Sequence, residues 1–168
     1  SEVPNKIDEY TSQASVEFAN KGFKHFRLRV ANDDVAAITA FLDQQVQDSL
    51  DNGVIPIIAN QSHSFEDNPT PETQAAWVKW WGDMAEHYKD YPYEVMFDLI
   101  IEIASRSALS DEPVEQLNEA YEQAVTAIRA TGGNNAERII IFSAHKRSDP
   151  TKLHLIDIPS QGNGYLIA

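Results

Sequence analysis

The sequence of 168 residues contains no cysteine, which excludes disulfide bonds and thiolate metal sites. No run of apolar residues approaches the roughly 20 that cross a bilayer, so no membrane partner is expected. The first residues lack the basic and then apolar pattern of a secretory signal. We therefore expect that any targeting peptide has been removed or never existed.

Basic residues are also scarce, with 13 lysines and arginines against 26 aspartates and glutamates, a formal net charge of −13. Such a surface repels phosphate backbones, so nucleic acid is not expected as a partner. The charge is compatible with a neutral substrate such as a polysaccharide, and equally with a halotolerant or marine protein. A hydrophobic fraction of 42% is typical of a globular domain.

Segments with helical periodicity alternate with segments that have the composition of strands. Asp33 and Asp34 offer N-capping carboxylates for one helix, and Thr70 followed by Pro71 marks the start of another. Strands joined through helices at this spacing are typical of right-handed βαβ units and a parallel sheet. The expected strands are 24–30, 54–59, 95–101, 138–143 and 164–168; the expected helices are 12–21, 35–51, 70–89 and 112–130, with a polar loop at 60–70.

The predicted class is therefore α/β, in a single domain over residues 1–168, because no repeat or linker divides the chain. Two closures fit this pattern, an open doubly wound sheet and a barrel. In the first expected strand, Arg27 and Arg29 share the face opposite Phe26, Leu28 and Val30. Two buried arginines would be costly in an open sheet covered by helices on both faces, which favours the barrel.

The third expected strand supplies the matching negative charge. Asp98 and Glu102 alternate onto one face with Met96 and Ile100. A barrel interior that contains these two carboxyl groups and the two arginines would balance its own charges. We therefore expect the four charged side chains on the concave side of the sheet, with helices on the convex side.

Polar side chains gather where the expected strands end, which is where parallel sheets of either closure bind ligands. A carboxylic acid, guanidinium groups and neutral donors on one rim suit the recognition of hydroxyl-rich substrates. The histidine and its basic neighbours after the fourth strand do not have metal-ligand spacing. The rim residues are Arg27, Arg29, Asn60, Gln61, His63, Glu102, His145, Lys146 and Arg147.

Several segments also match a known family, in order and over nearly the whole chain. Residues 22–30, Gly-Phe-Lys-His-Phe-Arg-Leu-Arg-Val, resemble a second strand written G-F-N-x-x-R-I-P-V. Residues 90–92 and 95–102, Asp-Tyr-Pro and Val-Met-Phe-Asp-Leu-Ile-Ile-Glu, resemble a fourth-strand region written K-D-Y-P…L-x-F-E-L-x-N-E-P. The helix over residues 77–88 and Ser-Ala-His at 143–145 match in the same way. The family they resemble is the cellulases of glycoside hydrolase family 5.

This resemblance implies a partial (β/α) TIM-type barrel that hydrolyses a β-linked polysaccharide or oligosaccharide in the manner of an endo-β-1,4-glucanase. It implies no cofactor and no metal, and a secreted or periplasmic location. Glu102 takes the place of the family's acid/base glutamate, and Arg27 that of the strand-two arginine beside the nucleophile. The residues expected to bind substrate are Arg27, Arg29, Gln61, His63 and His145.

The sequence departs from the family pattern at the site itself. Ile101 stands where the family has an asparagine that binds the sugar 2-hydroxyl, and Ile103 stands where it has proline. A histidine expected after the third strand of the barrel is not evident, although Gln61 or His63 could fill its space. These changes leave open a non-catalytic carbohydrate-binding relative.

The family's first, seventh and eighth strands have no counterpart here, and the seventh carries the nucleophile. Asp98 cannot replace it, because it lies four residues before Glu102, roughly 13 Å along the strand at about 3.3 Å per residue. Retaining hydrolysis needs two carboxyl groups about 5–5.5 Å apart. We therefore expect the nucleophile outside this chain, and the rest of the barrel or self-assembly as a partner.

The residues alone also bear on a third fold and on the role of the tryptophans. A small flavodoxin-like domain would bind a nucleotide or act as a receiver, but Ala-Asn-Asp-Asp at 31–34 offers no glycine-rich phosphate loop after the first strand. The tryptophans at 77, 80 and 81 are expected to pack a helix against the barrel rather than to serve as sugar platforms.

Overall fold

The structure, a computed structural model, describes residues 10–101, 103, 107–144, 146, 149–162 and 164–167. Five parallel strands form one sheet in the order β1-β2-β3-β4-β5, so that every strand pairs with its neighbour in sequence. A doubly wound sheet instead reverses its strand order at one point. The sequential order therefore confirms the barrel type of closure. The strands are β1 His25–Val30, β2 Ile55–Asn60, β3 Met96–Asp98, β4 Ile140–Ile141 and β5 Leu166–Ile167.

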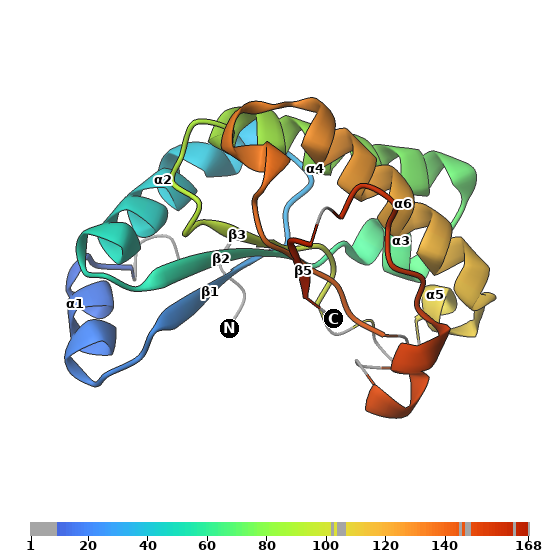
Figure 1. The fold of residues 1–168 in the computed structure, drawn as a ribbon, viewed down its shortest axis with the longest axis horizontal. Coiled ribbons are helices and arrows are strands. Elements are labelled where there is room, and N and C mark those ends of the chain that lie inside the picture. Colours follow the sequence, from blue (N-terminus) through green and yellow to red (C-terminus); the bar gives the residue numbers. More distant parts are fainter. Residues whose placement is uncertain are drawn as a thin grey trace.

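The helices α2, α4 and α6 lie next to one another along one side of the sheet (Figure 1). Helix α2 has the predicted bounds, and α4 and α6 begin and end within two residues of the prediction. Among the described helices, none combines the length and hydropathy that a bilayer span requires. The α-helices are α1 Gln13–Asn20, α2 Val35–Asp51, α3 His63–Asp67, α4 Pro71–Tyr88, α5 Ala108–Asp111 and α6 Val114–Ala130; short 3-10 helices are η3 Gly133–Ala136 and η4 Pro150–Leu155.

The predicted N-caps of α2 and α4 form hydrogen bonds in the structure. The Asp34 side chain accepts a hydrogen bond from the backbone N–H of Ala37 at the start of α2, at 3.2 Å. At the start of α4, Thr70 and Thr73 form a reciprocal capping box, with Pro71 at the first position. These side chains satisfy backbone donors that have no partner inside the helix.

The predicted polar loop at 60–70 is wrong in part, because it contains helix α3. The Ser62 side chain accepts a hydrogen bond from the backbone N–H of Phe65, and Phe65 is fully buried. A helix of five residues is too short to show a helical period in the sequence, so one cap and one buried ring define it. Helix α5 and the two 3-10 helices were also not predicted.

The first strand has the predicted alternation. Leu28 and Val30 are buried in the main core with Phe26 packed against it, whereas Arg27 is exposed on the other face. Strand β2 places Ile58 in the same core, but it is buried on both faces, since Ile57 and Ala59 are buried as well. The face of the sheet with Leu28, Val30 and Ile58 packs against the helices.

The three tryptophans of α4 belong to the same layer, and each is at least 95% buried. Every indole N–H donates a hydrogen bond of 3.0 Å to an acceptor at the carboxyl end of the sheet. These hydrogen bonds, together with the packing, fix the position of α4 relative to the strands. Their predicted packing role is confirmed. The pairs are Trp77 with Asn60 Oδ1, Trp80 with the Asn32 carbonyl, and Trp81 with the Leu99 carbonyl.

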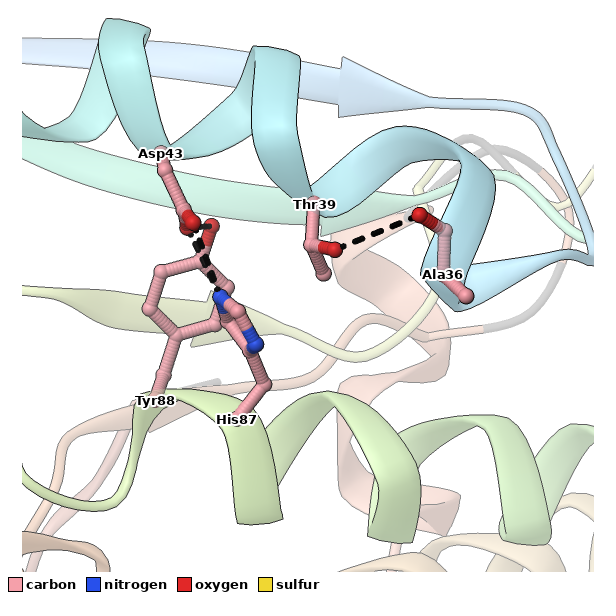
Figure 2. A network of polar contacts seen from close by, with 5 residues as sticks. All are labelled: Ala36, Thr39, Asp43, His87 and Tyr88. Carbon is pink, nitrogen blue, oxygen red and sulfur yellow. Dashed lines mark hydrogen bonds and ion pairs between the residues drawn. The ribbon is translucent and has the colours of Figure 1, made fainter.

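Helices α2 and α4 are also joined through Asp43 (Figure 2). Its carboxylate accepts a hydrogen bond from the Tyr88 hydroxyl at 2.8 Å and contacts Nε2 of His87 at 2.8 Å. One turn earlier on α2, the Thr39 hydroxyl donates to the Ala36 carbonyl. Burial is the main cause that raises the pKa of Tyr88, with the Asp43 hydrogen bond next, so the phenol remains a donor at any ordinary pH.

Strand β4 is shorter than the predicted segment 138–143, and Arg138, the first residue of that segment, lies outside the strand. Its guanidinium is fully buried, yet no carboxylate accompanies it among the described residues. Burial lowers its pKa to about 10, and it remains charged at neutral pH. The guanidinium lies over the Phe97 ring and joins the end of α4 to the start of β3. Its acceptors are the carbonyls of Tyr88, Tyr91, Pro92 and Val95 and the Asn135 side chain, at 2.5–3.0 Å.

Candidate functional site

An ion pair joins two of the charged residues that the strand pattern predicted on the concave side of the sheet. Arg27 on β1 and Asp98 on β3 lie 3.2 Å apart, measured from Nη2 to Oδ2, although β2 separates their strands. The Asp98 side chain is 1% exposed, whereas the Arg27 side chain is 52% exposed. A buried carboxylate thus meets a guanidinium that is open to solvent.

Burial raises the pKa of Asp98 to about 6, and the positive charge of Arg27 opposes that rise. Apart from the ion pair, neither carboxylate oxygen has a hydrogen-bond partner within the described residues. The group is therefore charged above about pH 6 at a cost in stability, and neutral below it.

Two other predicted residues carry buried polar atoms that are not hydrogen-bonded in the described part of the chain. They are Nε of Arg29, near the end of β1, and Oε1 of Gln61, directly after β2. The backbone N–H of Gln61 donates to the Val30 carbonyl at 2.8 Å, so the two strand ends are held together. One donor and one acceptor at adjacent strand ends are suited to a ligand hydroxyl, which can accept from one and donate to the other.

His63, also predicted to bind substrate, is the first residue of α3 and is exposed. Glu102 and His145, the predicted acid and a further predicted contact, lie outside the described residues. Of the predicted residues that are described, Arg29 and Gln61 lie at adjacent strand ends, and Arg27 lies further back in β1, opposite Ile57.

The end of β3 contains an irregularity that the sequence did not reveal. The N–H groups of Phe97 and Leu99 donate to β4 residues or their neighbours, as alternate residues of a strand do. Ile101 then donates to the Asn60 carbonyl, on the β2 side, at 3.0 Å. The predicted strict alternation is thus wrong from Leu99 onward, and Ile100 belongs to the main core rather than to the Asp98 face. An extra residue of this kind is a β-bulge, which commonly redirects side chains next to active sites.

Tyr121 of α6 is a rim residue that sequence reasoning missed. Its hydroxyl donates to the Ser143 carbonyl at 2.7 Å, so it fixes the chain just after β4. The ring is fully buried at regular helical spacing, which in a sequence is indistinguishable from ordinary core. A small pocket of about 110 Å³ also opens behind the rim; it is lined by Asp33, Asn60, Ser62, Ser64, Thr73, Ala76, Trp77 and Trp80.

The sequence model of the family described as cellulase (glycosyl hydrolase family 5) matches residues 4–167. The chain belongs to this family. Endoglucanase 1 of Ruminococcus albus is 25% identical over 170 residues, which cover 88% of this chain and 41% of that protein. This family 5 chain therefore spans less than half the length of that curated relative.

Solved structures agree on the fold of the family 5 chain. PbGH5A of Prevotella bryantii, a glycoside hydrolase family 5 enzyme, is 22% identical with a TM-score of 0.79, over 94% of this chain and 52% of its own. The cellulose synthase subunit Z of Clostridioides difficile is 22% identical with a TM-score of 0.79, over 90% of this chain and 50% of its own. The five-stranded parallel sheet with its helices thus corresponds to about half of a TIM-type barrel.

No group of three or more metal-ligating side chains is found among the residues that the structure describes. The polar groups of the rim are instead guanidinium, amide and carboxyl groups. These are suited to hydrogen bonding with sugar hydroxyls and to proton transfer.

Proposed function

We propose that this chain supplies the acid/base half of a retaining glycoside hydrolase that cleaves a β-linked polysaccharide, in the manner of an endo-β-1,4-glucanase. In the complete barrel, Glu102 protonates the glycosidic oxygen while a second carboxylate, from outside these 168 residues, attacks the anomeric carbon. Glu102 then takes a proton from the water that releases the covalent intermediate.

The match of the family over residues 4–167, on a sheet with the barrel's strand order, is the observation that carries this proposal. Glu102 follows Ile101 in the sequence, and Ile101 is still hydrogen-bonded to the end of β2. The rim of a TIM barrel formed by the carboxyl ends of its strands is where such enzymes place their chemistry. The residues on either side of Glu102 in the sequence, Ile101 and Ile103, are both buried.

Arg27, Arg29, Gln61, His63 and His145 are proposed to bind the sugar chain. Two polar atoms support this, Nε of Arg29 and Oε1 of Gln61, because neither has a hydrogen-bond partner among the described residues and each would gain one from a ligand hydroxyl. The substrate class is supported by the relatives. One carries the name Endoglucanase 1, and a variant of PbGH5A was crystallised with a xyloglucan tetradecasaccharide. A secreted or periplasmic location is proposed with it, since a polymer of this kind must be met outside the cytoplasm.

The complete site also requires the other half of the barrel, and we propose that it comes from a longer chain or from self-assembly. Within the described sheet, β1 and β5 each pair with one neighbour only. Unpaired edges of this kind readily pair with another strand.

The test is hydrolysis of a soluble β-1,4-glucan by the complete protein and by its Glu102→Gln variant. We expect the variant to lose about 10²–10⁴-fold in kcat, as removal of a general acid does. Binding of the polymer should survive, because glutamine keeps the shape of the site. Glu115→Gln, on the first turn of α6, is the matched control and should leave kcat unchanged.

A non-catalytic carbohydrate-binding relative is the alternative, and Ile101 favours it because the side chain that would contact the sugar 2-hydroxyl is apolar. If the complete protein binds the glucan but neither form hydrolyses it, the alternative is correct. If both forms hydrolyse it equally, Glu102 is not the acid.

A further inference from the structure

The ion pair of Arg27 and Asp98 is asymmetric, because its carboxylate is buried and its guanidinium is exposed. A carboxylate that is taken out of water without hydrogen bonds reduces stability, and one ionic contact offsets only part of that loss. A neutral or apolar side chain at position 98 would be the more stable choice. An aspartate at position 98 therefore indicates that its negative charge has a function.

The sheet leaves a path for this contact. Asp98 lies in register with Ala59 of β2, and Ala59 lies in register with Arg29 of β1. Arg27 starts one step lower, opposite Ile57, so its side chain runs diagonally across β2 to reach Asp98. The methyl group of Ala59 leaves room for the guanidinium to cross at that level.

An exposed arginine samples many rotamers, and holding it in one of them costs conformational entropy. Asp98 is fixed by β3 and by burial, so it provides a rigid anchor for one nitrogen of the guanidinium. Within the described residues the guanidinium has no other ion pair, so its remaining N–H groups can bind a second carboxylate on the concave side of the sheet.

We propose that Asp98 is a positioning residue that holds Arg27 across the sheet, so that the guanidinium meets the attacking carboxylate in the correct place. This inference rests on the proposed hydrolase function. Asp98 touches neither substrate nor the reacting atoms; it acts through Arg27.

The experiment uses the complete protein and measures kcat, KM and the pH profile on a soluble β-1,4-glucan. Asp98→Asn keeps the shape and removes the charge. A misplaced group of this kind can reduce the rate by about 10–100-fold. We expect such a loss in kcat with KM nearly unchanged, and partial recovery in Asp98→Glu. Ala59→Leu, which blocks the path but keeps both charges, should reproduce the loss.

The pH profile separates this role from a structural one. Among the residues that the structure describes, the charged and titratable groups around Asp98 are Arg27 and Arg29 of β1 and Tyr121 of α6, while β2 and β4 present Ala59 and Ile141. With Asp98 titrating at about 6, the wild-type rate should fall as the pH drops through that value. Asp98→Asn should lack this acid limb.

The matched control is Asp48→Asn. Asp48 is a buried carboxylate of α2, away from the concave face, and it accepts hydrogen bonds from Tyr10 and Gln44. This variant should leave kcat and the acid limb intact. An Asp98→Asn enzyme with wild-type kcat and profile overturns the proposal, and so does a loss that Asp98→Glu does not recover. Wild-type protein that is inactive on every β-glucan overturns the proposed function itself, which is a separate result.

Discussion

At the scale of single residues, two buried charged groups lie at opposite ends of the sheet. Asp98 is a buried carboxylate near the carboxyl ends of the strands, next to a solvent-exposed arginine. Arg138 is a buried guanidinium near the opposite ends, surrounded by carbonyl groups. The first weakens the fold near neutral pH, and the second holds several segments together.

Asp98 should make stability depend on pH in an unusual direction for an acid. Its pKa rises from 3.8 in the unfolded chain to about 6 in the fold, so the folded state binds the extra proton between these values. Stability is therefore greatest below pH 3.8 as far as this group is concerned, and is lost as the pH rises through 6. At 1.36 kcal/mol per pH unit, the loss is about 3 kcal/mol.

Urea unfolding of Asp98→Asn and wild type at pH 4 and pH 7.5 checks this expectation. The variant should be the more stable protein at pH 7.5, with most of the difference gone at pH 4. An equal difference at both pH values would show that the Asp98 carboxyl is not desolvated.

Arg138→Lys should destabilise the protein at every pH, although the charge is conserved. A lysine ammonium cannot reach acceptors spread over a planar fork, and each buried carbonyl left without a donor costs about 1–3 kcal/mol. We expect a total loss of about 2–4 kcal/mol in urea unfolding. Lys79→Arg, on the exposed face of α4, should change stability by less than about 0.5 kcal/mol.

At the scale of elements, the long helices owe their bounds to local chemistry that can be read from the sequence. The capping box of Thr70 and Thr73 begins α4, and loss of such a cap costs about 1 kcal/mol. Thr70→Ala should reduce the free energy of unfolding by that amount in a denaturant titration. Thr126→Ala, on the exposed face of α6, loses only a solvent-exposed hydrogen bond of 3.3 Å from Gln161 and should be close to neutral. Equal losses in both variants would indicate that the cap is not responsible.

The elements that sequence reasoning identified are those with a sustained period or a clear cap. Helix α2 has both, strand β1 has the sustained period, and Arg27 and Arg29 followed from the alternation of β1. Helix α3 depends on one cap and one buried ring, and the bulge after Asp98 depends on which neighbouring strand receives an N–H group. Neither of these features produces a hydrophobic period in the sequence, so the burial of Ile100 in the main core could not be predicted.

At the scale of the whole molecule, the described sheet is about half of the barrel seen in its relatives. Within this described sheet, each of the edge strands β1 and β5 pairs on one side only. The C-terminal part adds exposed apolar side chains, with Ile158 at 78% and Ile167 at 46% exposure. Such surfaces promote association. We expect the 168 residues alone to self-associate and to unfold without a sharp transition, by sedimentation velocity and thermal scanning. A dilute monomer with a cooperative transition would contradict this.

The central claim is that Glu102 is the acid of a family 5 hydrolase, and the leaving group tests it most directly. The measurement is the kcat/KM lost by Glu102→Gln in the complete protein on a β-1,4-glucan, divided by the kcat/KM lost on an aryl glycoside, because kcat/KM reports the first step, in which the leaving group departs. A phenolate leaves without protonation. Removing the acid should therefore lower the rate on the polymer by about 10²–10⁴-fold and the rate on the aryl substrate much less. A ratio well above one is the predicted result. Equal losses on both substrates, or no loss on either, would contradict the assignment.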